Sequence, residues 1–232
     1  MLTEELRTRY GVTVDAEPVR IALRETFTTG ASGHGRLVKQ SGGHGQFAIC
    51  DIEVEPLDSG SGFEFVDKVV GGSVPRQFVP SVEKGLHQQI VKGLDSGFPV
   101  VDIRVTLVDG KAHSVDSSDT AFQQAAGLAL KEAAAKATLS LLEPIDRVTI
   151  MVTDEYVGAV MSDLSGRRGR LVGTESISAG HTQILADVPQ LELSRYSIEL
   201  RSLTHGTASF MRDFGGYEPM PPQIAAKHRA NT

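Results

Sequence analysis

Three residues whose types can act together in hydrolysis, His113, Asp116 and Ser117, lie within five positions of the chain. A histidine base, a carboxylate that orients it and a hydroxyl nucleophile form a catalytic triad only when base and nucleophile face each other in a walled site. These three residues share one polar loop, and Asp116 or Ser117 is well placed to cap the helix that follows. The pattern therefore disfavours a hydrolase. From the residues alone, His113 is most simply a solvated loop histidine.

A glycine-rich loop and an arginine cluster are two further candidate contact sites. Glycines in the loop at 41–46 let the backbone approach a phosphate chain closely, and Gln46 can bond to sugar or base edges. An ordinary hairpin turn explains the same glycines. Planar arginine heads suit phosphate recognition, although a solvated basic loop is equally compatible with the cluster at 165–170. The histidines are scattered, with no recurring ligand spacing, so no metal site is predicted.

A helix from about residue 117 to 136 is expected to hold the His113 loop in place. Phe122, Ala126, Ala129 and Ala133 recur at helical spacing and form one apolar stripe. Because most of these side chains are alanines, the helix axis can come close to the layer beneath it. We expect that layer to be a sheet, with the loop held out from this rigid base.

The order of the other predicted elements indicates two α+β domains. Residues 26–144 read as three strands, a helix, a strand and a helix, which gives a two-layer sandwich; 28–35 is expected to be a connection and Glu143-Pro144 a boundary. Residues 145–232 follow the ferredoxin-like order βαββαβ and end in a frayed tail from Pro219. Residues 1–25 are expected to be the tail of a preceding domain, with short strands at 12–14 and 19–23.

The composition is that of a globular protein. The 232 residues are 40% hydrophobic and 22% charged. The single cysteine, Cys50, lies in an apolar alternation typical of a strand, which predicts a buried residue rather than a reactive thiol. No signal peptide or membrane-length apolar run is recognisable, so the cytoplasm is the expected location. The net charge of −6 argues against coating of nucleic acid by bulk electrostatics but leaves room for local patches.

Seven motifs in one order resemble translation elongation factor G. They lie at 41–46, 65–72, 75–85, 113–119, 141–145, 165–170 and 200–206. The resemblance covers nearly the whole chain and corresponds to the fourth and fifth domains of the family, with residues 1–25 matching the end of the third. No Gly-x-x-x-x-Gly-Lys-Ser/Thr phosphate loop occurs in the chain. The chain therefore looks like a C-terminal fragment of a longer GTPase.

The resemblance implies a fold and a role in protein biosynthesis. The fold is a ribosomal protein S5 domain 2-like sandwich with a left-handed crossover, followed by a ferredoxin-like domain. The role is movement of tRNA and mRNA through the ribosome, with the fourth domain reaching the decoding region of the small subunit. The fifth domain lies near the sarcin–ricin loop and the stalk base. GTP and Mg would belong to the missing N-terminal part of the parent, with no catalytic residue, cofactor or metal in this monomeric fragment.

The residues that the resemblance assigns to RNA contact fall into two groups. The group at the tip of the fourth domain is Gly42, Gly43, His44, Gly45, Gln46, His113, Asp116 and Ser117. The group in the fifth domain is Ser165, Arg167, Arg168 and Arg170.

Two departures from the family pattern suggest a divergent paralogue. His44 stands where most members carry Arg or Lys, and the segment at 205–208 reads His-Gly-Thr-Ala instead of Gln-Gly-Arg-Gly. The alternative functions are ribosomal protection or another non-translocating role and, less favoured, a small-molecule hydrolase.

Overall fold

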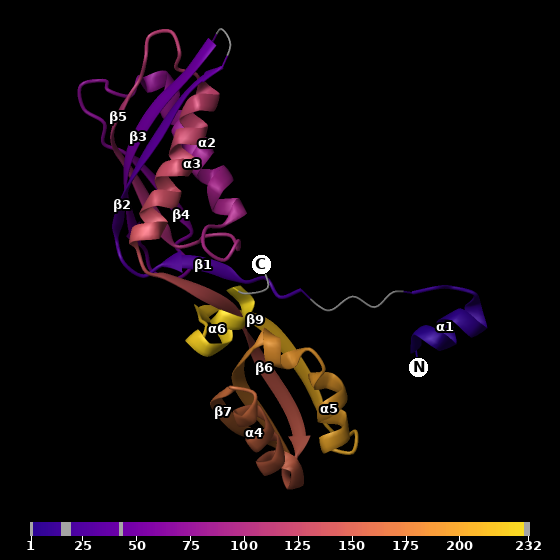
Figure 1. The fold of residues 1–232 in the computed structure, drawn as a ribbon. Coiled ribbons are helices and arrows are strands. Elements are labelled where there is room, and N and C mark those ends of the chain that lie inside the picture. The colour runs from indigo at the N-terminus through magenta and orange to yellow at the C-terminus, as the bar shows by residue number, and fades with distance from the viewer. Residues whose placement is uncertain (1, 15–19, 42–43, 230–232) are drawn as a thin grey trace. The chain divides into compact units, whose positions relative to one another are not determined.

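The structure, a computed structural model, describes residues 2–14, 20–41 and 44–229 (Figure 1). Two sheets with helices packed on them give the predicted α+β fold. The chain divides into a larger unit, Leu23–Arg147 with Arg212–Thr232, and a smaller unit, Met1–Ala22 with Val148–Met211. Within the described ranges, no helix has both the length and the apolar character needed to cross a membrane.

The larger unit contains a four-stranded sheet with the order β2-β3-β5-β4. Its strands are β2 (Ala31–Ser41), β3 (His44–Pro56), β4 (Phe63–Asp67) and β5 (Ile103–Lys111), and only the β4–β5 pair is parallel. Helix α2 (Val79–Lys92) connects β4 to β5, and α3 (Asp119–Lys136) follows β5. Figure 1 shows both helices on one face of the sheet, which makes the predicted two-layer sandwich. The left hand of the β4–α2–β5 crossover stays a prediction.

Helix α3 lies directly on β2 because the strand presents glycines to it. A Cβ atom added to Gly33 would overlap the carbonyl oxygen of Ala129, and one added to Gly35 would overlap that of Ala125. The predicted alanine stripe of α3 is fully buried here. The prediction of a connection at 28–35 is wrong for 31–35. The glycines that suggested a turn instead allow close contact between strand and helix.

Three other sequence-based boundaries differ from the structure. The strands predicted at 12–14 and 19–23 are not formed by the described residues 11–14 and 20–23, and residues 15–19 lie outside the described residues. The first strand is instead β1 (Arg24–Phe27), which pairs antiparallel with β6 (Leu139–Thr153). The strand predicted from Arg147 begins instead at Leu139, so Glu143 and Pro144 lie inside β6. The predicted frayed tail contains helix α6 (Pro222–Arg229), which begins with proline and buries Ala225.

Residues 139–219 have the predicted ferredoxin-like order of elements, although the start of β6 and the end of β9 are grouped with the larger unit. β6 is followed by α4 (Val157–Gly166), β7 (Arg170–Ser178), β8 (His181–Pro189), α5 (Tyr196–Leu203) and β9 (Ser209–Pro219). The strand order of this sheet is β1-β6-β8-β7, and β9 also pairs with β6. Apolar residues of β6 and β8, including Ile150 and Ile184, are buried with those of α4 and α5, including Val160 and Leu200. The N-terminal residues of the smaller unit contain α1 (Leu2–Tyr10), as predicted.

Candidate RNA-binding tip

The loop after β5 and the start of β3 are joined by hydrogen bonds. The backbone N–H of Phe47 donates to the carbonyl oxygen of Asp116 over 2.9 Å, and the Ser117 hydroxyl donates to the carbonyl oxygen of Phe47 over 2.6 Å. At Gly45, an added Cβ would lie 2.7 Å from Cγ of Asp116, so any other residue there would force the Asp116 side chain to move. The two loops that were identified separately in the sequence therefore form one surface, which we call the tip (residues 44–47 and 113–117).

His113 is held by its Nδ1 atom and remains half exposed. Nδ1 lies 3.1 Å from Oδ2 of Asp116 and also 3.4 and 3.3 Å from the backbone nitrogens of Val115 and Asp116. A neutral ring accepts the backbone N–H groups at Nδ1, whereas a protonated ring donates there to the carboxylate. The ring also lies against that of Phe47, with 6.0 Å between the centroids. The side chain is 51% exposed, so the remaining ring surface is presented to solvent.

The three residues with triad-like chemistry do not form a nucleophile–base pair. The Ser117 hydroxyl donates to Phe47 and accepts the backbone N–H of His113 at 2.9 Å. Its proton is therefore directed at a carbonyl oxygen instead of the imidazole. Both contacts instead fix the shape of the tip.

Ser118, and neither Asp116 nor Ser117, caps α3. Its extended backbone (φ −147°, ψ 164°) lets Oγ accept the N–H of Ala121 at 3.2 Å. The prediction of the cap was wrong by one or two residues because all three side chains can accept such a bond. Asp119 lies in the first turn, as predicted, where the helix dipole favours a negative charge.

Replacing the cap is expected to weaken the larger unit modestly. Ser118→Ala leaves the Ala121 N–H without its acceptor and should lower the free energy of unfolding by about 1 kcal/mol. Denaturant unfolding followed by circular dichroism measures the change. Ser114→Ala is the matched control in the same loop and should have almost no effect; equal losses from both variants would contradict the cap assignment.

Some tip residues were missed by the sequence analysis, and others are not described. Val115, between His113 and Asp116, is 74% exposed and so belongs to the tip surface. Its apolar, β-branched side chain in an otherwise polar loop is the sequence feature that could have identified it. Gly42 and Gly43 lie outside the described residues. His44 is the first residue of β3, paired with Ser41, and Gln46 follows in the same strand opposite Lys39.

In the smaller unit, Arg167 is enclosed by protein groups. Its guanidinium contacts Asp163 at 2.8 Å and Glu199 at 2.6 Å, donates to the carbonyl oxygen of Glu192 at 3.1 Å, and lies 4.8 Å above the centre of the Tyr196 ring. These contacts, led by the hydrogen bond to Asp163, raise the pKa of Arg167 above its usual range. Burial raises the pKa of Tyr196 as well. The Arg167 side chain thus links α4 to α5.

The other residues of the arginine cluster are more exposed. Arg168 contacts Glu192 at 2.9 Å, and Arg170 contacts Asp187 at 3.1 Å. Arg170 is 66% exposed, compared with 26% for Arg168 and 20% for Arg167. The Ser165 hydroxyl donates to a carbonyl oxygen one turn earlier in α4. Of the three arginines, Arg170 therefore presents the largest part of its side chain to solvent.

Two family descriptions match the chain, one over the range that contains the tip and one over the range that contains the arginines. Residues 19–138 match the family described as elongation factor G, domain IV, and residues 140–228 match the elongation factor G C-terminus. The chain belongs to the elongation factor G family. This is a family of translation factors, and the tip lies in the domain IV match while the arginines lie in the C-terminal match.

Individual relatives agree with this assignment. An elongation factor G-like protein of Mycobacterium tuberculosis (strain CDC 1551 / Oshkosh) is 63% identical over 99% of this chain and 32% of that protein. Elongation factor G of Aquifex pyrophilus is 44% identical over 98% of this chain and 32% of that protein. A crystal structure of a Thermus thermophilus protein superposes with a TM-score of 0.89 at 36% identity, covering 99% of this chain and 34% of that one. The chain spans about a third of the length of the relatives it matches.

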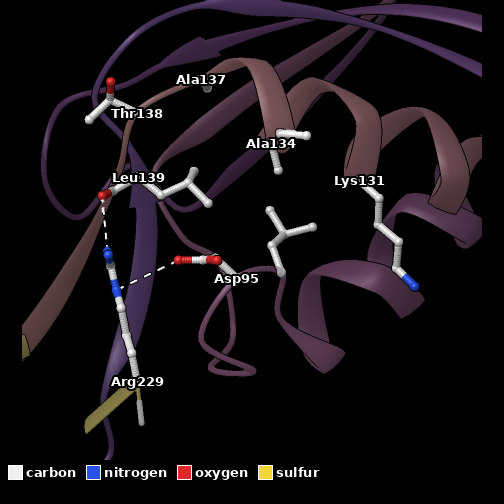
Figure 2. Close-up of a pocket in the computed structure, with 9 residues that line it drawn as sticks. Asp95, Lys131, Ala134, Ala137, Thr138, Leu139 and Arg229 are labelled. Atoms are coloured by element: carbon white, nitrogen blue, oxygen red, sulfur yellow. Dashed lines mark hydrogen bonds and ion pairs between the residues drawn. The ribbon is translucent and has the colours of Figure 1, made fainter. Parts of the chain in front are cut away.

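Two other features of this chain are a buried cysteine and a surface hollow. Cys50 is fully buried in β3, and burial raises the pKa of its thiol to about 12, which keeps it neutral, as expected for a packed strand residue. A hollow of about 540 Å³ lies at the end of α3, where Arg229 of α6 contacts Asp95 at 3.6 Å and donates to the carbonyl oxygen of Leu139 (Figure 2). Its described lining contains no residue of the tip.

Proposed function

We propose that the chain is the C-terminal ribosome-binding portion of an elongation factor G-type translational GTPase. In this role the tip enters the decoding region of the small subunit and contacts the tRNA–mRNA duplex during translocation. The main support is the joining of two distant loops into one exposed surface at Phe47, Asp116 and Ser117. An exposed imidazole on such a surface can stack on a base and bond to phosphate or a 2′-hydroxyl.

The second proposed contact is made by the arginine cluster with RNA of the large subunit, near the sarcin–ricin loop and the stalk base. Arg170 is best suited to this contact because it is the most exposed of the three arginines. Arg167 would contribute indirectly, since its ion pairs hold α4 and α5 together. GTP and Mg would bind to the N-terminal part of the longer protein, and we propose a cytoplasmic, monomeric factor.

His113→Ala in the full-length factor tests the role of the tip. Loss of one stacking side chain at a base is worth about 1 to 3 kcal/mol, so tRNA–mRNA movement should slow on the order of tenfold. GTP hydrolysis should stay nearly intact because the tip carries none of that chemistry. Single-turnover translocation and hydrolysis assays measure the two steps separately.

His87→Ala serves as the control for this experiment. His87 is an exposed histidine of α2 in the same unit, packed edge-on against Phe63. Its replacement should leave translocation unchanged. Loss of GTP hydrolysis with unchanged movement in His113→Ala would contradict the proposed role of the tip.

A divergent paralogue, without full translocase activity, is the second candidate. The sequence departs from the family pattern at His44 and at 205–208, and the 63% identical relative is named an elongation factor G-like protein. A ribosomal protection function belongs to this same group of alternatives. The test is to express the full-length parent in cells that lack the main factor. Failure to restore growth supports the paralogue, and full restoration refutes it.

A further inference from the structure

A second surface feature of the larger unit is a groove between α2, α3 and β2. This groove has a volume of about 450 Å³. Its described lining includes Lys39 of β2, Lys92 of α2 and Lys131 of α3, and no aspartate or glutamate. Side-chain amides from both helices complete it: Gln88, Gln89, Gln123 and Gln124. None of the tip residues lines it, so the groove is a separate surface.

The three lysines make the groove locally basic in a chain whose net charge is −6. All three are exposed, and none forms an ion pair with another described residue. Lys131 lies where the groove meets the neighbouring hollow, and Figure 2 shows it on the opposite side of that hollow from Arg229. Among the described residues, no carboxylate therefore forms an ion pair with the three ammonium groups around the groove.

Gly127 lines the groove at a position where the fold itself does not require glycine. It lies within α3, where glycine is less stable than alanine. An added Cβ would meet only the Gln89 side chain, at 3.6 and 3.8 Å, which is ordinary van der Waals contact. By contrast, Gly85 of α2 is required for packing, because its Cβ would overlap the backbone of Gln123. Gly127 therefore has no packing reason in the fold, and an added methyl group would lie beside Gln89 in the lining of the groove.

The chemistry of the lining identifies the class of partner. Protein–protein interfaces depend on apolar and aromatic anchors, whereas interfaces with nucleic acids are more polar and more positive. Here the large apolar side chains of the described lining are buried Leu37 and half-exposed Leu128, and no aromatic residue is among them. The other lining residues are the lysines, the four glutamines, Thr120 and two glycines. Lysine pairs with phosphate, and amides can donate to phosphate and both donate to and accept from a 2′-hydroxyl. We propose that this groove binds the sugar–phosphate backbone of an RNA duplex.

Binding of a short RNA duplex to the 232-residue chain, measured by fluorescence anisotropy over a salt series, tests this proposal. Three phosphate contacts predict a slope of log K against log salt of roughly −2.7. The double variant K92Q/K131Q should weaken binding and reduce the magnitude of the slope by about 2. K68Q/K84Q is the matched control, with the same change of charge at exposed lysines outside the groove, and should keep the wild-type slope.

Gly127→Ala separates a binding role from a structural one. If the groove binds RNA, this variant should lose affinity for the duplex while gaining thermal stability, because alanine favours the helix. Unchanged affinity with increased stability would overturn the proposal, since the glycine would then have no role in access.

Other probes distinguish the alternative occupants. Tighter binding of polyglutamate than of RNA would assign the groove to an acidic protein. Equal binding of a DNA duplex of the same sequence would show that the 2′-hydroxyl has no role. Either result overturns the proposal. Loss of duplex binding in His113→Ala but not in K92Q/K131Q would place the duplex at the tip and also overturn it. The test of the tip measures the rate of translocation, whereas the test of the groove measures affinity for an RNA duplex. The tip proposal and the groove proposal can therefore fail independently.

Discussion

Gly35→Ala is expected to destabilise the larger unit by at least about 3 kcal/mol, because the new methyl group meets backbone instead of a movable side chain. Its Cβ would overlap the carbonyl oxygen of Ala125 and lie 2.6 Å from the backbone nitrogen of Ala129. Helix α3 would have to move away from β2, which would also loosen the alanine stripe buried between them. Denaturant unfolding, together with hydrogen exchange of the α3 amides, measures the effect.

Two further variants make this prediction specific. Gly173→Ala is the control, because Gly173 also lies in a strand but has no atom within 4 Å of an added Cβ. It should be neutral or slightly stabilising. In the Gly35→Ala background, trimming Ala125 to glycine should not restore stability, since the overlapping atom belongs to the backbone. Recovery of stability in that double variant would contradict the proposed helix–strand contact.

The region around Gly35 shows what periodicity can predict. The spacing of Phe122, Ala126, Ala129 and Ala133 correctly predicted a helix lying close on a sheet. The matching glycines of β2 were assigned to a connection, because glycine is also the commonest turn residue. A glycine needed for close packing can be told from a turn glycine only by the residue that packs against it. For Gly35 that residue is Ala125, 90 residues further along the chain.

For the candidate site too, the sequence predicted the residues but not the contacts between distant parts of the chain. The tip loops could be found from residue types and from the family resemblance, but their connection through Ser117 and Phe47 is a contact between residues far apart in the sequence. The same limit applies to the arginine cluster. Nothing in the local pattern around Arg167 indicates that Glu199 of α5 lies within 2.6 Å of it. Charge patterns reveal which residues can bind phosphate, and only the structure shows which are already engaged.

Glu25 was also missed, because a glutamate in a four-residue strand has no distinctive pattern. It is only 1% exposed, and its carboxylate organises the chain after α2. Oε1 accepts the backbone N–H groups of Leu94, Ser96 and Phe98, at 3.4, 3.0 and 2.9 Å, and Oε2 accepts that of Asp95 at 3.1 Å. One side chain thereby satisfies four backbone donors about 70 residues away.

Glu25→Ala is therefore expected to cost about 3 to 5 kcal/mol, since it leaves these four N–H groups, partly or fully buried, without an acceptor. Glu25→Gln is the graded control. Its remaining oxygen can keep the three bonds made by Oε1, while its amide faces the N–H of Asp95 and loses one bond, so the expected cost is about 1 to 2 kcal/mol. Denaturant unfolding gives the two free energies, and hydrogen exchange at Ser96 and Phe98 should accelerate most in the alanine variant. Equal losses from the two replacements would show that burial of the side chain, and not its acceptor oxygens, stabilises this segment.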